Sequence, residues 1–310
     1  GSRWVQACIR PWQLLFPRRT RAWLEMGAAC GRLVLELAIR QLAPDENNAE
    51  GEAADATCHV LILALDYPGT GNELTCTQDG DNMQELCRLS GVTDVTVLYN
   101  NQANREQVLA KIQEIGERCE EGDYFIFNYS GHGTSVPDKD GDEEDGKDEA
   151  LCLVTPDGRL DFGGFLTDDD FADAITEACE EGVKILIMCD CCHSGTIGDF
   201  KSDMETWEGH TALSMSGCAD NQTSGDVGGG IWTHSLLMAI EELQREGVEE
   251  YSIAQLYNKQ LAKDDEVFNS QQDIQLKWSA DLGNATNMEW PLVPKAPYVA
   301  PYTRRMQGQY

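Results

Sequence analysis

The sequence contains few basic residues and no long apolar run. Its 23 lysines and arginines stand against 54 aspartates and glutamates, which gives a formal net charge of −31 at pH 7. Because such a surface repels phosphate, no nucleic-acid partner is expected, and cationic peptides or metal cations are favoured instead. No stretch approaches the roughly 18 consecutive apolar residues of a membrane-spanning helix, so no membrane span is expected.

The 12 cysteines do not indicate a disulfide-rich scaffold. Cys58, Cys152 and Cys189 lie inside apolar runs, where thiols pack as small hydrophobic groups. This usage is typical of a reducing compartment, and we expect a cytoplasmic protein. The alternative is an organelle, with the N-terminal segment as its targeting signal.

Composition divides the chain into distinct regions. Residues 1–43 contain seven arginines and only two acidic residues, and a polar linker follows over residues 44–57. Because residues 1–43 are opposite in charge to the rest, we predict an inhibitory pro-segment that docks on the acidic domain. An amphipathic targeting or partner-binding helix is the alternative. The proline-rich tail, residues 294–310, is predicted to be extended, either packed along the surface or loose.

Short apolar runs alternate with amphipathic stretches between the linker and the tail. We expect strands at 58–65, 95–98, 123–128, 150–154, 184–189 and 211–216, and helices at 79–90, 104–118, 168–181, 234–246 and 252–263. Strands that alternate with helices indicate right-handed crossover connections. The predicted fold class is therefore α/β, with a mostly parallel central sheet and helices on both faces.

A histidine and a cysteine each follow a predicted buried strand. Residues 130–133 read Ser-Gly-His-Gly, and residues 190–195 read Asp-Cys-Cys-His-Ser-Gly. Parallel strands bring both motifs to one edge of the sheet, where a thiolate nucleophile could pair with an imidazole base. Neighbouring strand residues point to opposite faces, so only one of Cys191 and Cys192 can face the cleft. The alternative is a structural thiol and a loop histidine.

These motifs resemble those of the metacaspases, caspase-fold cysteine peptidases of plants, fungi and protists. The resemblance covers roughly residues 58–293 and includes residues 141–149, 166–170 and 216–224 in the family's order. It implies a caspase-like fold with a large-subunit-like region, 58–200, and a small-subunit-like region, 201–293. It also implies a monomeric endopeptidase with Cys192 as nucleophile and His132 as base. The backbone N–H groups of Gly133 and Cys192 would form the oxyanion hole.

The resemblance implies cleavage of protein or peptide substrates after Arg or Lys. A cationic side chain needs carboxylates in its pocket. Asp190 lies two residues before Cys192 and therefore on the same strand face. Cys76 and Asp79 resemble the family's specificity-pocket loop, and Ser130 would complete the lining. The alternative for Asp79 is an N-cap of the following helix.

An acidic loop follows the histidine motif. Residues 138–149 contain eight carboxylates, which repel one another unless they are solvated or bind a hard cation such as Ca²⁺. An EF-hand is rejected because Glu143 stands where that loop requires glycine. By the resemblance, the expected calcium ligands are Asp148, Glu149, Asp168 and Asp169. The alternative is that residues 168–170 only supply favourable charge at a helix N-terminus.

Together these features predict a calcium-stimulated, self-processing cysteine endopeptidase. One alternative is a caspase-fold peptidase of different specificity. A second is a catalytically silent, calcium-binding interaction module. The presence of both His132 and Cys192 argues against the silent module.

Overall fold

The computed structural model describes residues 56–137, 146–192, 197–198, 200, 206–217, 228–270, 272–279 and 287–308. The chain divides into two units, Gly1–Glu50 and Gly51–Tyr310, and all described residues belong to the second. The predicted pro-segment, most of the acidic loop (138–145) and most of the 216–224 motif lie outside the described residues.

Six strands form the central sheet, in the order β2-β1-β3-β7-β8-β9. The strands are β1 (Cys58–Ala64), β2 (Asp94–Tyr99), β3 (Tyr124–Ser130), β7 (Lys184–Asp190), β8 (Thr211–Ser216) and β9 (Gln275–Trp278). All neighbours pair in parallel except β8 and β9, which are antiparallel. The α/β class with a mostly parallel sheet is therefore confirmed.

A second, antiparallel sheet was not expected from the sequence. It contains β4 (Gly133–Pro137), β5 (Lys147–Leu151) and β6 (Leu166–Thr167). The strand predicted at 150–154 is displaced toward the N-terminus and becomes β5 of this small sheet rather than a strand of the central sheet. The last four residues of β5 are all buried, a pattern that suits either sheet, and its antiparallel pairing with β4 and β6 decides its place.

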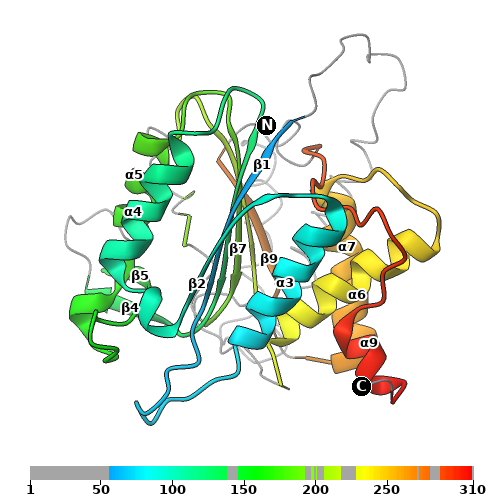
Figure 1. The fold of residues 1–310 in the computed structure, drawn as a ribbon, viewed down its shortest axis with the longest axis horizontal. Helices are drawn as coiled ribbons and strands as arrows, with labels where there is room; N and C mark the ends of the chain where they lie inside the picture. The colour runs from blue at the N-terminus through cyan, green and yellow to red at the C-terminus, as the bar shows by residue number, and fades with distance from the viewer. Residues whose placement is uncertain are drawn as a thin grey trace, which may run out of the picture. The chain divides into compact units, whose positions relative to one another are not determined.

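Helices cover both faces of the central sheet. Their bounds are α3 (Thr77–Ser90), α4 (Arg105–Gly116), α5 (Asp168–Ala178), α6 (Ile231–Arg245), α7 (Ile253–Lys263) and α9 (Pro301–Met306), with single turns at Asn100–Gln102, Phe162–Gly164 and Asp264–Phe268. Figure 1 shows α4 and α5 on one face and α3, α6 and α7 on the other. All seven residues of β3 are buried, as a parallel strand between two helical layers requires.

The proline-rich tail is packed rather than loose. The Gln244 side-chain amide donates hydrogen bonds to the carbonyls of Pro294 and Ala296, and its oxygen accepts one from the Tyr298 N–H. Ala300 is fully buried. The prediction of an extended tail is wrong for residues 301–306, which form α9 beside α6 (Figure 1) with Pro301 in the first turn, a position that proline favours. The tail therefore forms part of the folded domain.

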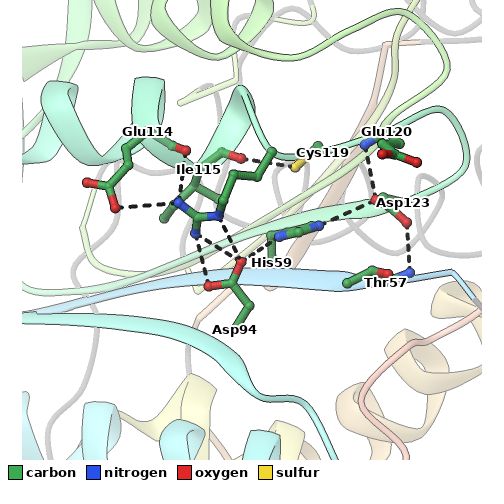
Figure 2. A network of polar contacts seen from close by, with 9 residues as sticks. Thr57, His59, Asp94, Glu114, Ile115, Cys119, Glu120 and Asp123 are labelled. Carbon is green, nitrogen blue, oxygen red and sulfur yellow. Dashed lines mark hydrogen bonds and ion pairs between the residues drawn. The ribbon is translucent and has the colours of Figure 1, made fainter.

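A polar network ties together the amino-terminal ends of three strands (Figure 2). His59 on β1 lies between two carboxylates, with Nδ1 2.6 Å from Asp94 and Nε2 3.4 Å from Asp123. Arg118 donates three further hydrogen bonds to Asp94. Burial raises the pKa of Asp94, but the bonds from His59 and Arg118 outweigh burial and hold it below its usual value.

We expect this network to make stability acid-sensitive. Burial also raises the pKa of Asp123, but hydrogen bonds from backbone N–H groups and His59 outweigh it and lower the pKa. A carboxyl whose pKa is lower in the folded state stabilises the fold above its unfolded pKa of about 4, and that stabilisation is lost as the pH falls. Urea unfolding at pH 5.5 and pH 3 measures how much the free energy of unfolding falls with acid. This decrease should be about 1 kcal/mol smaller in His59→Gln than in wild type. Equal losses would contradict this prediction.

Candidate active site

The histidine loop connects β3 to β4 and is held by two buried tyrosines. The Tyr67 hydroxyl accepts a hydrogen bond from the His132 N–H at 2.8 Å and donates to the Cys152 carbonyl at 3.0 Å. The Tyr129 hydroxyl donates to the His132 carbonyl at 2.6 Å. Burial raises the pKa of both tyrosines well above its usual value, so both hydroxyls stay protonated. The backbone on either side of the imidazole is therefore fixed.

The imidazole of His132 has a defined orientation. Its Nε2 lies 2.8 Å from the carbonyl oxygen of Asn72, and its ring packs against that of Tyr67 at a tilt of 38°, with centroids 4.7 Å apart. A carbonyl only accepts hydrogen bonds, so Nε2 carries a proton. Nδ1 is then the nitrogen that can receive or return a proton at a neighbouring thiol.

The cysteine loop lies directly against the histidine loop. Ser130 pairs with Asp190 in the parallel register of β3 and β7, and the Gly131 N–H donates to the Asp190 carbonyl at 3.3 Å. A methyl group added at Gly133 would overlap the carbonyl oxygen of Cys192. The structure thus brings the His132–Gly133 segment into van der Waals contact with the Cys192 backbone, a distance that only glycine permits.

The two adjacent cysteines occupy different environments. Cys191 is 1% exposed and packs in the hydrophobic core on the α4 and α5 side of the sheet. Cys192 is partly exposed. The alternation along the strand leaves this choice open, whereas the structure makes Cys192 the thiol that solvent can reach.

The four residues predicted to line the specificity pocket lie at the same edge of the sheet. Asp190 is buried, and its Oδ2 accepts hydrogen bonds from the N–H and hydroxyl of Thr233, each at 2.8 Å. Asp79 is 1% exposed and accepts the Gly230 N–H at 2.9 Å. Both carboxylates therefore reach the amino end of α6. Ser130 is fully buried beside Asp190, and its hydroxyl has no partner among the described residues.

The N-cap alternative for Asp79 is wrong. The helix begins at Thr77, two residues earlier than expected, with Cys76 as its N-cap. Asp79 therefore lies inside the first turn, where its carboxylate crosses to Gly230. Cys76 is buried at the same helix end.

A cluster of buried carboxylates joins β5 to α5. Asp148 and Asp168 are each 1% exposed, and Glu149 is 4% exposed. Asp168 Oδ2 accepts the Glu149 N–H at 3.3 Å, whereas its Oδ1 has no partner among the described residues. Burial, with repulsion from Glu149 and Asp169, raises the pKa of Asp168 to about 9.

This donor set fits a hard divalent cation. Carboxylate oxygens are the ligands that Ca²⁺ prefers, and a cation would relieve the repulsion that raises the pKa of Asp168. The described residues by themselves contain no group of three or more acidic, His or Cys side chains arranged around one metal position. The helix-charge alternative is compatible with the structure, because Asp168, Asp169 and Asp170 form the first turn of α5, directly after its side-chain cap Thr167.

Several residues of the site carry no signal in the sequence. Tyr67 and Asn72 hold the histidine loop, and Thr233 binds Asp190 across 43 positions of sequence. None belongs to a motif that indicates catalysis.

Among the described residues, no helix combines the length and the apolar character of a membrane-spanning segment.

Part of the chain is similar in sequence to a known family of peptidases. Residues 59–201 match the family model described as metacaspase, peptidase C14 domain. Metacaspase-1 of Arabidopsis thaliana is 35% identical over 152 residues, which cover 40% of each protein. Metacaspase-2 of the same plant is 31% identical over 220 residues, 60% of this chain and 51% of the relative. The match thus spans about half the length of these relatives or less.

Solved structures agree on the fold. A protein from Geobacter sulfurreducens superimposes with a TM-score of 0.58 at 25% identity, covering 77% of this chain and all of that one. Caspase-1 from Spodoptera frugiperda superimposes with a TM-score of 0.50 at 15% identity, covering 76% of this chain and 92% of that one. The central sheet and its helical layers form a caspase-like fold, and residues 59–201 are similar to the metacaspase peptidase C14 domain.

Proposed function

We propose that this protein is a calcium-stimulated cysteine endopeptidase that cleaves after Arg or Lys, with Cys192 as nucleophile and His132 as proton shuttle. The contact between Gly133 and the Cys192 backbone carries the proposal, because it places the two loops at one edge of the sheet. The buried Asp79 and Asp190 beside these loops support the preference for a cationic side chain.

The chemistry follows the usual order for a thiol peptidase. The Cys192 thiolate attacks the substrate carbonyl carbon, and the carbonyl electron pair moves to oxygen. The N–H groups of Gly133 and Cys192 donate to this oxyanion, each worth about 10²-fold in rate or more. The proton on His132 Nδ1 passes to the leaving amine as the C–N bond breaks. Water then attacks the acyl-enzyme, gives a proton to Nδ1, and releases the acid and the thiolate.

The pocket carboxylates also support the fold around them. A carboxylate has about four acceptor positions, so Asp79 can bind the Gly230 N–H and a substrate cation at the same time. Asp190 can likewise bind Thr233 and the cation. A guanidinium with its five donors suits two carboxylates better than a point charge does, so Arg is expected to exceed Lys as a substrate.

Peptide hydrolysis tests the proposal. Fluorogenic peptides that end in Arg, Lys, Asp or Asn are compared with calcium and with a chelator. Arg and Lys peptides should be cleaved faster with calcium than with the chelator, and the other two should not be cleaved. Preference for Asp or Asn would favour the peptidase of different specificity. Failure of an arginyl chloromethyl ketone to label Cys192 would favour the silent module.

Calcium would be held by Asp148, Asp168 and Asp169, with Glu149. When bound, it would neutralise their buried charge and order the acidic loop that follows β4. That loop begins six residues after His132, so calcium bound there would act close to the catalytic edge. The crowding that raises the pKa of Asp168 supports this assignment.

We expect Asp168→Asn to stabilise the calcium-free protein and to weaken its response to calcium. The folded state keeps a proton on Asp168 up to a pH of about 9, whereas the unfolded chain loses it near pH 4. The free energy of unfolding without calcium therefore falls as the pH rises between these values. At pH 8 the asparagine should stabilise the chelated protein by about 1–3 kcal/mol.

Thermal unfolding at pH 6 and pH 8, with calcium or chelator, measures both effects. Asp173→Asn is the matched control, because Asp173 is an exposed aspartate on the same helix. If Asp168→Asn and Asp173→Asn show the same unfolding temperature and the same calcium shift, the assignment of Asp168 is wrong.

A further inference from the structure

Three consecutive glycines, residues 228–230, lie between the two pocket carboxylates. The Gly230 N–H donates to Asp79, and a methyl group added at Gly230 would overlap the Asp190 carboxylate. A methyl group at Gly229 would lie 2.7 Å from Asp79 Oδ1. We call residues 228–230 the triple-glycine segment. Its contacts on this side show that it forms a wall of the proposed cation pocket.

The opposite side of the triple-glycine segment contacts the C-terminal helix. The Gly228 carbonyl accepts a hydrogen bond from the Arg305 guanidinium at 3.0 Å, and the Nε2 of His234 lies 3.2 Å from the same oxygen. Gly228 and Gly229 have φ of 83° and 108°, conformations that other residues rarely adopt. The segment therefore depends on outside contacts to keep its conformation.

Helix α9 holds Arg305 in place. The Tyr302 ring lies 4.9 Å from His234 and 4.8 Å from Phe268, and the Arg305 guanidinium carbon lies 5.5 Å from the Tyr302 ring centroid. At the start of the helix, the Thr303 hydroxyl donates to Glu241 on α6 at 2.6 Å. Arg305 thus approaches Gly228 from a helix anchored to α6.

We propose that Arg305 is a positioning residue for substrate recognition. Supported by Tyr302, it fixes the triple-glycine segment and with it the placement of Asp79 and Asp190 around a substrate cation. The proposal rests on the proposed function, in which those carboxylates bind Arg or Lys. It gives the C-terminal tail a role in specificity, although α9 lies outside the 59–201 family match.

Arg305 has two opposing effects on substrate affinity, and the larger one decides whether its loss weakens or strengthens binding. Its positive charge repels a substrate cation, whereas its hydrogen bond keeps the pocket in shape. The side chain is only half-buried, so solvent and salt screen the charge. The hydrogen bond acts on a backbone that contacts Asp79 directly. The hydrogen bond to Gly228 is therefore expected to outweigh the charge repulsion, and loss of Arg305 should weaken substrate binding.

Steady-state kinetics of Arg305→Met in the full chain test the proposal. We expect KM for an Arg-ending peptide to rise about tenfold, with kcat within about twofold of wild type. Arg304→Met is the matched control, because Arg304 lies on the same helix and donates to the Val299 carbonyl instead. Arg305→Lys should restore part of the loss. An unchanged or lower KM in Arg305→Met would overturn the proposal, as would a fall in kcat and unfolding temperature without a change in KM.

Amide hydrogen exchange gives a second readout that needs no substrate. The N–H groups of Gly229 and Gly230 donate to Thr75 and Asp79, and both should exchange faster in Arg305→Met than in Arg304→Met. Equal exchange overturns the positioning role. If wild type cleaves no basic peptide while exchange still accelerates, the proposed specificity has failed and the contact between α9 and the pocket wall stands.

Discussion

Replacing Cys192 by alanine is expected to lower kcat/KM for an Arg-ending peptide at least about 10³-fold, because the acyl-enzyme is proposed to form on the Cys192 sulfur. Cys191→Ala is the matched control. Cys191 is 1% exposed and packs in the core, so its loss should cost about 1 kcal/mol of stability and leave kcat/KM within about threefold. Both variants differ from wild type by a single sulfur atom.

Peptide hydrolysis and thermal unfolding separate the two cysteines. The Cys192→Ala variant should be inactive with an unchanged unfolding temperature, and the Cys191→Ala variant should be active and less stable. The reverse pattern would make Cys191 the nucleophile. It would also require the loop after β7 to rearrange, because Cys191 is the buried member of the pair.

Gly133→Ala is expected to lower kcat/KM by about 10²-fold or more while both His132 and Cys192 remain. The added methyl group would overlap the Cys192 carbonyl oxygen and lie 3.2 Å from Cys191 Sγ. The histidine and cysteine loops must then move apart, and a misplacement of about 1 Å between reacting groups can cost about 10²-fold in rate.

Kinetics and alkylation measure this effect. Gly163→Ala is the control, since a methyl group there meets only an Asp161 side-chain oxygen at 3.2 Å. Iodoacetamide should still modify Cys192 in Gly133→Ala, which shows that the thiol is present while hydrolysis is lost. Activity of Gly133→Ala within about threefold of wild type would falsify the close contact between the two loops.

The fold was largely predictable because its strands are buried on both faces. The apolar runs of β1, β3 and β7 alternate with helices at predictable spacing, and the bounds of these three strands lie within two residues of the predicted ones. The short strands β4, β6 and β9 were missed. Two to five residues carry too little periodicity to indicate a strand, and their partners alone define them.

The sequence by itself determined that a histidine and a cysteine meet, since parallel strands end at one edge of the sheet. Alternation along the strand also identified Asp190 as a residue of that edge, and the resemblance to the metacaspases added Asp79. Only the tertiary structure decided that Cys192 is the accessible thiol and that Nε2 of His132 is held by Asn72. It alone placed the triple-glycine segment between Asp79 and Arg305, contacts that span 151 and 77 positions. Local patterns report which face of an element is buried, whereas contacts over such separations arise only when the whole chain packs.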